Sequence, residues 1–304
     1  MSASYERNIF SMRTLLVGDS QGLRKHLADQ ADTILNSPQL TIPAPDESQE
    51  PLSRVLAKQI AEHRPQSILI AGGDGTINAT AEALLALNAS LPCRLIPTGT
   101  ANDLARTLAE IRLSNEEPSC MIDIIRARLN DETRCRCCVN MFTLGTSARN
   151  MDYVTTEVKE RWGAFAYLSQ FWQTLADLVP LSLTMQVGRS EPLRLNGLLN
   201  AFVANGPTCG GGFRIAPEAN LADGRMNAVL LREGTATELT GLTAAFLAGI
   251  HLDHKLVEHF AADQIVFQSP HPIPITLDGE RAEAQRIELS IVPQFLAIDL
   301  WKTE

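Results

Sequence analysis

Along the first 111 residues, short apolar runs alternate with segments in which apolar residues recur at helical spacing. Short apolar runs, typical of buried strands, occur at residues 13–17, 67–71 and 94–96, with a shorter candidate at 40–42. Apolar side chains at helical spacing occur at residues 22–35, 53–62 and 77–87. Strands that alternate with helices predict an α/β domain with a parallel sheet.

The alternation of strand and helix patterns stops after residue 111. Two β-rich runs lie between residues 121 and 143, and two helical segments follow at 152–160 and 165–178. Further strands are expected at residues 181–187, 193–205, 227–232, 264–267, 273–277, 286–291 and 295–300, with one helix among them at 238–248. The chain is therefore expected to have an α/β domain at residues 1–112 and a mostly antiparallel β domain at 113–294.

The composition is that of a folded soluble protein, with 45% hydrophobic and 20% charged residues in a chain of 304. The net charge of −9 argues against binding to nucleic acid, which needs a basic face, and against electrostatic docking on anionic lipid. The apolar segment at 164–181 contains Gln170, Asp177 and Pro180, so it is too polar to span a bilayer. No signal-peptide pattern is present, so the expected location is the cytoplasm, with at most transient contact with a membrane surface.

The strand at 67–71 leads into a glycine loop that opens a helix. Its residues are Gly72, Gly73, Asp74, Gly75, Thr76, Ile77 and Asn78. Glycines let the backbone approach a phosphate, and the first N–H groups of a helix point at it. Asp74 suggests a divalent metal between its carboxylate and the phosphates. The alternative is a tight turn in which an aspartate caps the helix.

A second loop of the same kind follows the strand at 94–96. It runs from Pro97 through Gly99, Thr100, Asn102 and Asp103 into the next helix. Parallel strands bring the loops at their carboxyl ends to one edge of the sheet, where ligands bind. We therefore expect the two loops to converge.

Four motifs together resemble the diacylglycerol kinase catalytic family, especially its bacterial soluble lipid kinases. The motifs are residues 72–78, residues 99–103, Gly210-Gly211-Gly212 with Ala216-Pro217 and Ala222-Asp223-Gly224, and Leu277-Asp278-Gly279-Glu280. The resemblance implies transfer of a phosphoryl group from ATP, with Mg²⁺, to the hydroxyl of diacylglycerol or a related lipid alcohol. It also implies an N-terminal fold like that of NAD kinase and a C-terminal β-sandwich, with the final strand at about 295–304 rejoining the first domain and the active site between the domains.

The resemblance assigns roles to individual residues. The glycine loop and Thr100 would contact the nucleotide, and Asp74 would hold Mg²⁺ directly or through water. Glu280 matches the family's proton acceptor, and Asp278 would sit beside it and share metal or proton duties. A plain Asp-Gly hairpin turn is the other interpretation of residues 277–280.

A further metal site is implied for the loop that contains Asp223. The family often binds a structural Mg²⁺ there through this carboxylate and the backbone carbonyls at the positions of Asn220 and Arg225. An ordinary Asp-Gly turn would explain the same residues.

The expected partners are a nucleotide and a lipid presented at a membrane surface, and a homodimer is compatible with the sequence. Aromatic residues at 162–172, including Trp162 and Trp172, are interpreted as core or as a membrane-facing surface. Two other functions stay open: a kinase for a soluble substrate such as NAD, and a nucleotide- or lipid-binding regulator without catalysis. The second is motivated by Gly18-Asp19-Ser20-Gln21-Gly22, which replaces the family's early Asn-Pro signature.

Overall fold

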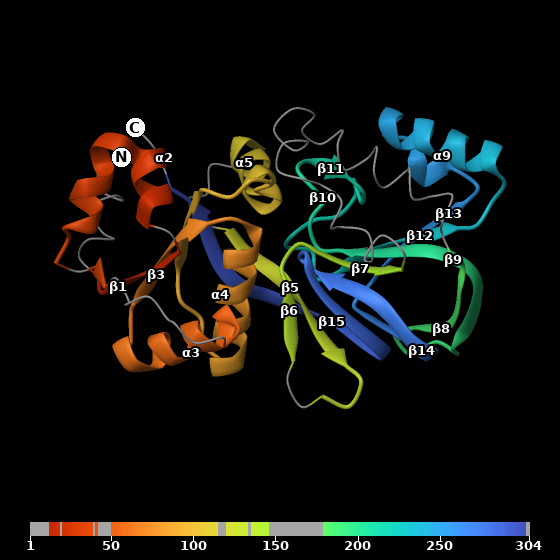
Figure 1. Ribbon diagram of the computed structural model, residues 1–304, viewed down its shortest axis with the longest axis horizontal. Helices are drawn as coiled ribbons and strands as arrows, with labels where there is room; N and C mark the ends of the chain where they lie inside the picture. Colours follow the sequence, from red (N-terminus) through yellow and green to blue (C-terminus); the bar gives the residue numbers. More distant parts are fainter. Residues whose placement is uncertain are drawn as a thin grey trace. The chain divides into compact units, whose positions relative to one another are not determined.

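The computed structural model describes residues 12–18, 20–38, 40–41, 50–114, 120–132, 135–145 and 179–301. Contacts divide the chain into two compact units, one of residues 1–122 and 294–304 and the other of residues 123–293. Figure 1 shows the elements of each unit.

The first unit contains a parallel sheet centred on β3 (Ser67–Gly72), which is buried along its whole length. This strand pairs with β1 (Thr14–Gly18) on one side and with β4 (Cys93–Pro97) on the other. β1 also pairs with the short β2 (Leu40–Thr41), and β4 pairs with the last residues of β15 (Glu280–Leu300). All of these pairings are parallel, as the alternation of strands and helices predicts.

In the described part of the first unit, four helices accompany this sheet. They are α2 (Ser20–Leu35), α3 (Leu52–His63), α4 (Asp74–Leu87) and α5 (Asp103–Ser114). The apolar stripe of α2 packs into one cluster with strand residues such as Leu16 and Leu69. α3 and α4 are joined by a buried hydrogen bond of 3.0 Å from the Ser53 hydroxyl to the Glu82 carboxylate.

The second unit is built mainly from antiparallel strands. These are β5 (Cys120–Leu129), most of which lies in this unit, β6 (Arg136–Cys138), β7 (Met141–Gly145), β8 (Leu181–Val187), β9 (Leu193–Ala204), β12 (Met226–Arg232), β13 (Val257–Ala262), β14 (Gln264–Leu277) and the first part of β15. A small two-stranded sheet, β10 (Thr208–Cys209) with β11 (Phe213–Arg214), flanks Gly210–Gly212.

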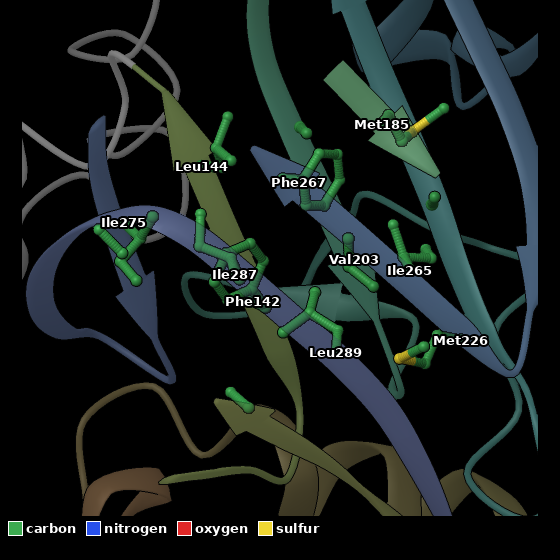
Figure 2. Packing of buried hydrophobic residues seen from close by; sticks show 14 of the residues in the cluster. Phe142, Leu144, Met185, Val203, Met226, Ile265, Phe267, Ile275, Ile287 and Leu289 are labelled. Carbon is green, nitrogen blue, oxygen red and sulfur yellow. The ribbon is translucent and has the colours of Figure 1, made fainter. Parts of the chain in front are cut away.

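One core cluster of the second unit is mostly aliphatic and contains Phe142 and Phe267. Figure 2 shows Phe142 and Phe267 among Ile265, Ile287 and Leu289, all of them with 0% exposure. Burial of each such side chain contributes about 1.5–3 kcal/mol relative to exposure. This core fixes the mutual register of β7, β14 and β15, which determines where the β14–β15 turn lies.

Two pairs of predicted strands are wrong in their bounds, because each pair is one strand. The segments expected at 264–267 and 273–277 are both β14, whose pairing with β15 shifts register between Gln268 and Ile273. The segments expected at 286–291 and 295–300 are both part of β15. In the sequence, Pro270, Pro272 and Pro293 indicate that a strand ends. In the structure, Pro270 and Pro272 lie at the register shift between Gln268 and Ile273, and β14 continues beyond them.

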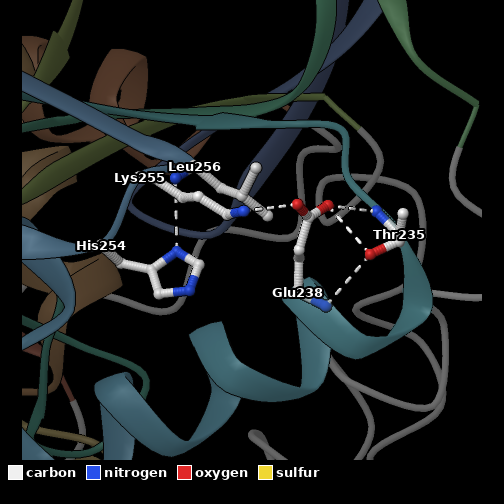
Figure 3. Close-up of polar contacts among 5 residues, drawn as sticks. All are labelled: Thr235, Glu238, His254, Lys255 and Leu256. Atoms are coloured by element: carbon white, nitrogen blue, oxygen red, sulfur yellow. Dashed lines mark hydrogen bonds and ion pairs between the residues drawn. The ribbon is translucent and has the colours of Figure 1, made fainter.

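The helix predicted at 238–248 is α9 (Ala236–Ala248), which begins two residues earlier. Figure 3 shows the reason: the Thr235 hydroxyl accepts a bond from the Glu238 N–H, and the Glu238 carboxylate accepts one of 2.7 Å from the Thr235 N–H. Glu238 also pairs with Lys255 at 2.6 Å. These contacts, with Lys255 foremost, lower the pKa of Glu238 to about 2. Among the described helices, none has the length and apolar character needed to cross a membrane.

Candidate active site

The two glycine loops of the first unit meet at Gly73 and Gly99. A Cβ atom on Gly99 would lie 2.4 Å from the Gly73 Cα, and one on Gly73 would lie 2.9 Å from the Gly99 Cα. The Thr98 N–H also donates to the Gly72 carbonyl at 3.1 Å. Because β3 and β4 are parallel neighbours, both loops leave the same edge of the sheet, so their predicted convergence is confirmed.

Asp74 links the first loop to the helix that follows the second. Its Oδ2 accepts a 3.1 Å hydrogen bond from the Asp103 N–H, and its Oδ1 accepts one of the same length from the Leu104 N–H. Burial raises the pKa of Asp74, whereas the Leu104 N–H lowers it and the neighbouring Asp103 raises it. The carboxylate therefore caps α5, and it does not cap the helix on which it stands, because the N-cap of α4 is Gly73.

The first turn of α4 remains without a side-chain cap. The first N–H groups of a helix have no acceptor within that helix, so this end favours an anion. Gly75 is exposed, and a Cβ atom there would meet nothing within 4 Å. The N–H groups of Thr76 and Ile77 are already used, since both donate to the Gly73 carbonyl.

The remaining predicted nucleotide residues differ in exposure. Ile77 and Asn78 are each 1% exposed, so the Ile77 side chain belongs to the core. The buried Asn78 Oδ1 accepts no hydrogen bond. Thr100 is exposed on the second loop. Asn102 braces that loop, because its Nδ2 donates to the Gly99 carbonyl at 2.7 Å.

In the second unit, residues 277–280 form the turn between β14 and β15. Leu277 pairs with Glu280, and the two central residues have positive φ, +47° at Asp278 and +90° at Gly279. Two central residues with positive φ are the signature of a type I′ hairpin, for which Asp-Gly is a preferred pair. The hairpin interpretation is therefore confirmed, and it is compatible with a catalytic role for the same residues.

The Asp278 carboxylate is enclosed by donors from residues 138–141. It accepts N–H bonds from Val139 at 2.6 Å, Asn140 at 3.1 Å and Met141 at 2.8 Å, and the Cys138 thiol lies 3.2 Å away. Burial raises the pKa of Asp278 to about 6, with these donors acting in the opposite direction. Its hydrogen-bonding capacity is thus committed to holding the turn, which assigns Asp278 a structural task beside any share in the chemistry.

The raised pKa of Asp278 predicts a pH dependence of stability. The pKa of Asp278 in the folded protein is about 6, whereas the ordinary pKa of an aspartate carboxyl is 3.8. The contribution of Asp278 to the free energy of unfolding should therefore rise by about 1–3 kcal/mol as the pH falls from 7 to 4. Urea unfolding of the wild type and of Asp278→Asn across this range checks it. A difference between the two proteins that does not change with pH would contradict the expectation.

Glu280 lies at the exposed end of the same turn. Its carboxylate is 51% exposed and is paired with Arg136 at 2.8 Å, while the Arg136 side chain is only 17% exposed. The partly buried Arg136 guanidinium donates to the Glu280 Oε2 and so orients the carboxylate. A carboxylate held in this way can accept a proton from a hydroxyl.

The loop with the predicted metal ligands is held by a buried carboxylate and by hydrogen bonds within the loop. Asp123, which is 0% exposed, accepts a 2.6 Å bond from the Gly224 N–H through its Oδ2. The Asp223 Oδ1 accepts from the Arg225 N–H at 2.9 Å, and the Asn220 Oδ1 accepts from the Ala222 N–H at 3.1 Å. In the described part of the chain, no three or more His, Cys, Asp or Glu side chains are grouped so that they could hold a metal ion. A metal in this loop would therefore depend on backbone carbonyls as well as on Asp223.

Sequence reasoning missed Arg136, residues 138–141 and Asp123. It also missed Asn205, whose Nδ2 donates to the carbonyls of Asp123 at 2.8 Å and Val139 at 2.7 Å. Arg136 is 144 positions from Glu280, and residue 139 is 139 positions from Asp278, so no local pattern connects them. The available signal was limited to Asn205-Gly206-Pro207 at the end of a predicted strand. The aromatic segment at 162–172 lies outside the described residues.

Comparison with known families agrees with this geometry. Residues 17–135 match the diacylglycerol kinase catalytic domain, and residues 141–299 match the YegS C-terminal NAD kinase beta sandwich-like domain. The chain belongs to the diacylglycerol kinase and YegS family of lipid kinases. This confirms the resemblance inferred from the four motifs and the fold class predicted with it.

Similar proteins cover most of the chain. "Probable lipid kinase YegS-like" of Cronobacter sakazakii is 30% identical over 246 residues, which are 77% of this chain and 78% of that protein. The protein of the same name from Klebsiella pneumoniae is 28% identical over 239 residues, 76% of each chain. The crystal structure of a diacylglycerol kinase from Bacillus anthracis shares the fold, with a TM-score of 0.70 at 16% identity over 95% of this chain and 97% of that one.

Proposed function

We propose that this lipid kinase transfers the γ-phosphoryl group of ATP to the hydroxyl of diacylglycerol or a related lipid alcohol. The observation that carries the proposal is the uncapped N-terminus of α4, packed against a second glycine loop, in a member of a lipid kinase family. The acceptor would reach the enzyme at a membrane surface.

The nucleotide half of the site would be the first loop and its neighbour. Gly73 and Gly75 would let the backbone approach the phosphates. The donors would be N–H groups at the start of α4 that come before those of Thr76 and Ile77, which already bond to Gly73. Thr76 and Thr100 add hydroxyl groups that are at least partly exposed. Asn78 adds a buried amide whose oxygen accepts no hydrogen bond, and an incoming donor could satisfy it.

Asp74 fits a role as a Mg²⁺ ligand, directly or through water. Its oxygens accept N–H bonds from Asp103 and Leu104, and carboxylate oxygens are ligands that Mg²⁺ prefers. When bound, the ion would neutralise the negative charge on the transferring group. The N–H groups of α5 hold the carboxylate in place for this task.

Glu280 would accept the proton of the attacking hydroxyl. As the lipid oxygen forms its bond to the γ-phosphorus, the bond from that phosphorus to the bridging oxygen breaks and ADP departs. The proton passes to the Glu280 carboxylate, which Arg136 orients. We assign the Asp223 loop, with the carbonyls of Asn220 and Arg225, to a structural metal that would stiffen the second unit.

The deciding experiment offers ATP labelled at the γ-phosphate, with Mg²⁺, to a total lipid extract in mixed micelles and, separately, to NAD. A labelled lipid that depends on Mg²⁺ is the expected product. Label on NAD with none on lipid would show a kinase for a soluble substrate. Binding of ATP with no transfer to either acceptor would show a regulator without catalysis and overturn the proposal.

A further inference from the structure

Asn140 lies between two segments that the family motifs single out, the 277–280 turn and the Gly210–Gly212 loop. It is 5% exposed and stands between β6 and β7 in the second unit. The motifs contain no residue from this stretch. Its hydrogen bonds nevertheless reach toward both segments.

In one direction Asn140 holds the turn that carries the proposed base. Its N–H donates to both oxygens of Asp278, at 3.1 and 3.3 Å. In return, the Asp278 N–H donates to the carbonyl of the next residue, Met141, at 3.1 Å. Glu280 is two residues beyond Asp278 on a tight turn, so a displacement of Asn140 is transmitted to the Glu280 carboxylate.

In the other direction Asn140 holds the strand that leads into the glycine loop. Its side-chain Nδ2 donates to the Thr208 carbonyl at 2.7 Å, and its own carbonyl accepts from Asn205 at 2.9 Å and from Gly206 at 3.1 Å. Thr208 begins β10, which runs directly into Gly210. One side chain and its backbone thus connect the Glu280 turn to the start of the glycine loop.

The fit around Asn140 is close and carries a cost. A Cβ atom on Gly206 would lie 2.2 Å from the Asn140 Oδ1. That Oδ1 is buried and accepts no hydrogen bond, which is normally destabilising. An apolar side chain of the same size would fill this space without burying an oxygen that has no hydrogen bond. An amide at this position is therefore explained by the bond that its Nδ2 donates to the Thr208 carbonyl.

We propose that Asn140 is a positioning residue, which sets the Glu280 carboxylate relative to the Gly210–Gly212 loop through paired contacts with Asp278 and Thr208. This inference rests on the proposed function, because Glu280 is the base in that reaction. It adds that the Gly210–Gly212 loop is part of the reactive geometry, on the acceptor side of the reaction.

Two variants displace Asn140 by different means. Asn140→Asp keeps the volume but removes the donor to the Thr208 carbonyl. Gly206→Ala keeps Asn140 and forces its side chain to move. Gly241→Ala in α9 is the matched control, because a Cβ atom there meets only the His254 Nε2 at an ordinary 3.6 Å.

Both variants should lower kcat by about 10- to 100-fold per ATP-binding molecule, because small misplacements of reacting groups cost this much. The KM for ATP should change by less than about twofold, since ATP would bind the first unit, and Gly241→Ala should match the wild type. Hydrogen exchange of peptides covering 208–214 and 277–281 should be faster in both variants at a temperature where they are folded. The hydrogen-exchange measurement requires no activity, so it tests the contacts of Asn140 even if the wild type phosphorylates no lipid.

Unchanged kcat per ATP-binding molecule in both variants would overturn the proposal and leave Asn140 a purely structural residue. Unchanged exchange of both peptides would overturn it as well. Absence of lipid phosphorylation by the wild type would instead overturn the proposed function, which separates the two failures.

Discussion

Glu280→Gln is expected to lower kcat for lipid phosphorylation by about 10²- to 10⁴-fold, the usual contribution of a general base. The amide keeps the shape of the side chain but cannot accept the proton. Because Glu280 is 51% exposed and its partner Arg136 retains an oxygen to contact, the melting temperature should change little. Transfer of labelled phosphate and thermal unfolding, measured on the same preparations, check both parts.

The control for this variant is Glu283→Gln. Glu283 is exposed on the same strand, three residues from Glu280, and loses the same charge. It should retain wild-type kcat. Equal losses in the two variants would mean that the charge of the strand matters and would remove Glu280 from its role as base, whereas full activity of Glu280→Gln would do so directly.

Gly99→Ala should abolish most of the activity through packing alone. Its Cβ atom would lie 2.4 Å from the Gly73 Cα and 2.8 Å from the Asn102 Oδ1, so the two glycine loops must separate. We expect a destabilisation of about 1–3 kcal/mol from this overpacking. Since the loops would no longer present their donors together, kcat/KM for ATP should fall by about 100-fold or more.

Gly75→Ala is the matched control for the steric argument. No atom lies within 4 Å of a Cβ at this position, and alanine is favoured over glycine in a helix by about 1 kcal/mol. Its melting temperature should be equal to or above that of the wild type. Its KM for ATP should rise, because the added methyl group would lie where the proposed function places the nucleotide phosphates. Chemical denaturation and ATP titration of both variants separate loop packing from phosphate contact. Equal stability of Gly99→Ala and Gly75→Ala would contradict the contact between the loops.

The sequence predicted the first unit well because its evidence is local. A strand buried on both faces is a continuous apolar run, and the helices show their stripes, so β3 and α4 could be placed from residues 67–87 alone. Convergence of the loops followed from the parallel order of β3 and β4. By contrast, β14 and β15 are each predicted as two strands, because both contain proline. The sequence does not show which N–H groups a strand can leave unpaired.

The partners of the site residues were beyond the sequence. The alternative interpretation of Asp74 places it as a cap of its own helix, whereas its carboxylate caps α5, whose first residues are 29 and 30 positions away. Asp278 was expected beside Glu280 in the chemistry, and nothing nearby indicated that residues 138–141 enclose it. Such contacts depend on the register between β7 and β14, which is set by the whole core.

β15 has a consequence for synthesis of the protein. Its residues 298–300 pair with β4 in the first unit, although 171 residues, 123–293, separate the two segments of that unit. On the ribosome, one edge of β4 therefore stays unpaired until residues 298–300 have been made. Chains that stop before residue 298 should expose that edge permanently, so we expect them to be prone to aggregation and degradation.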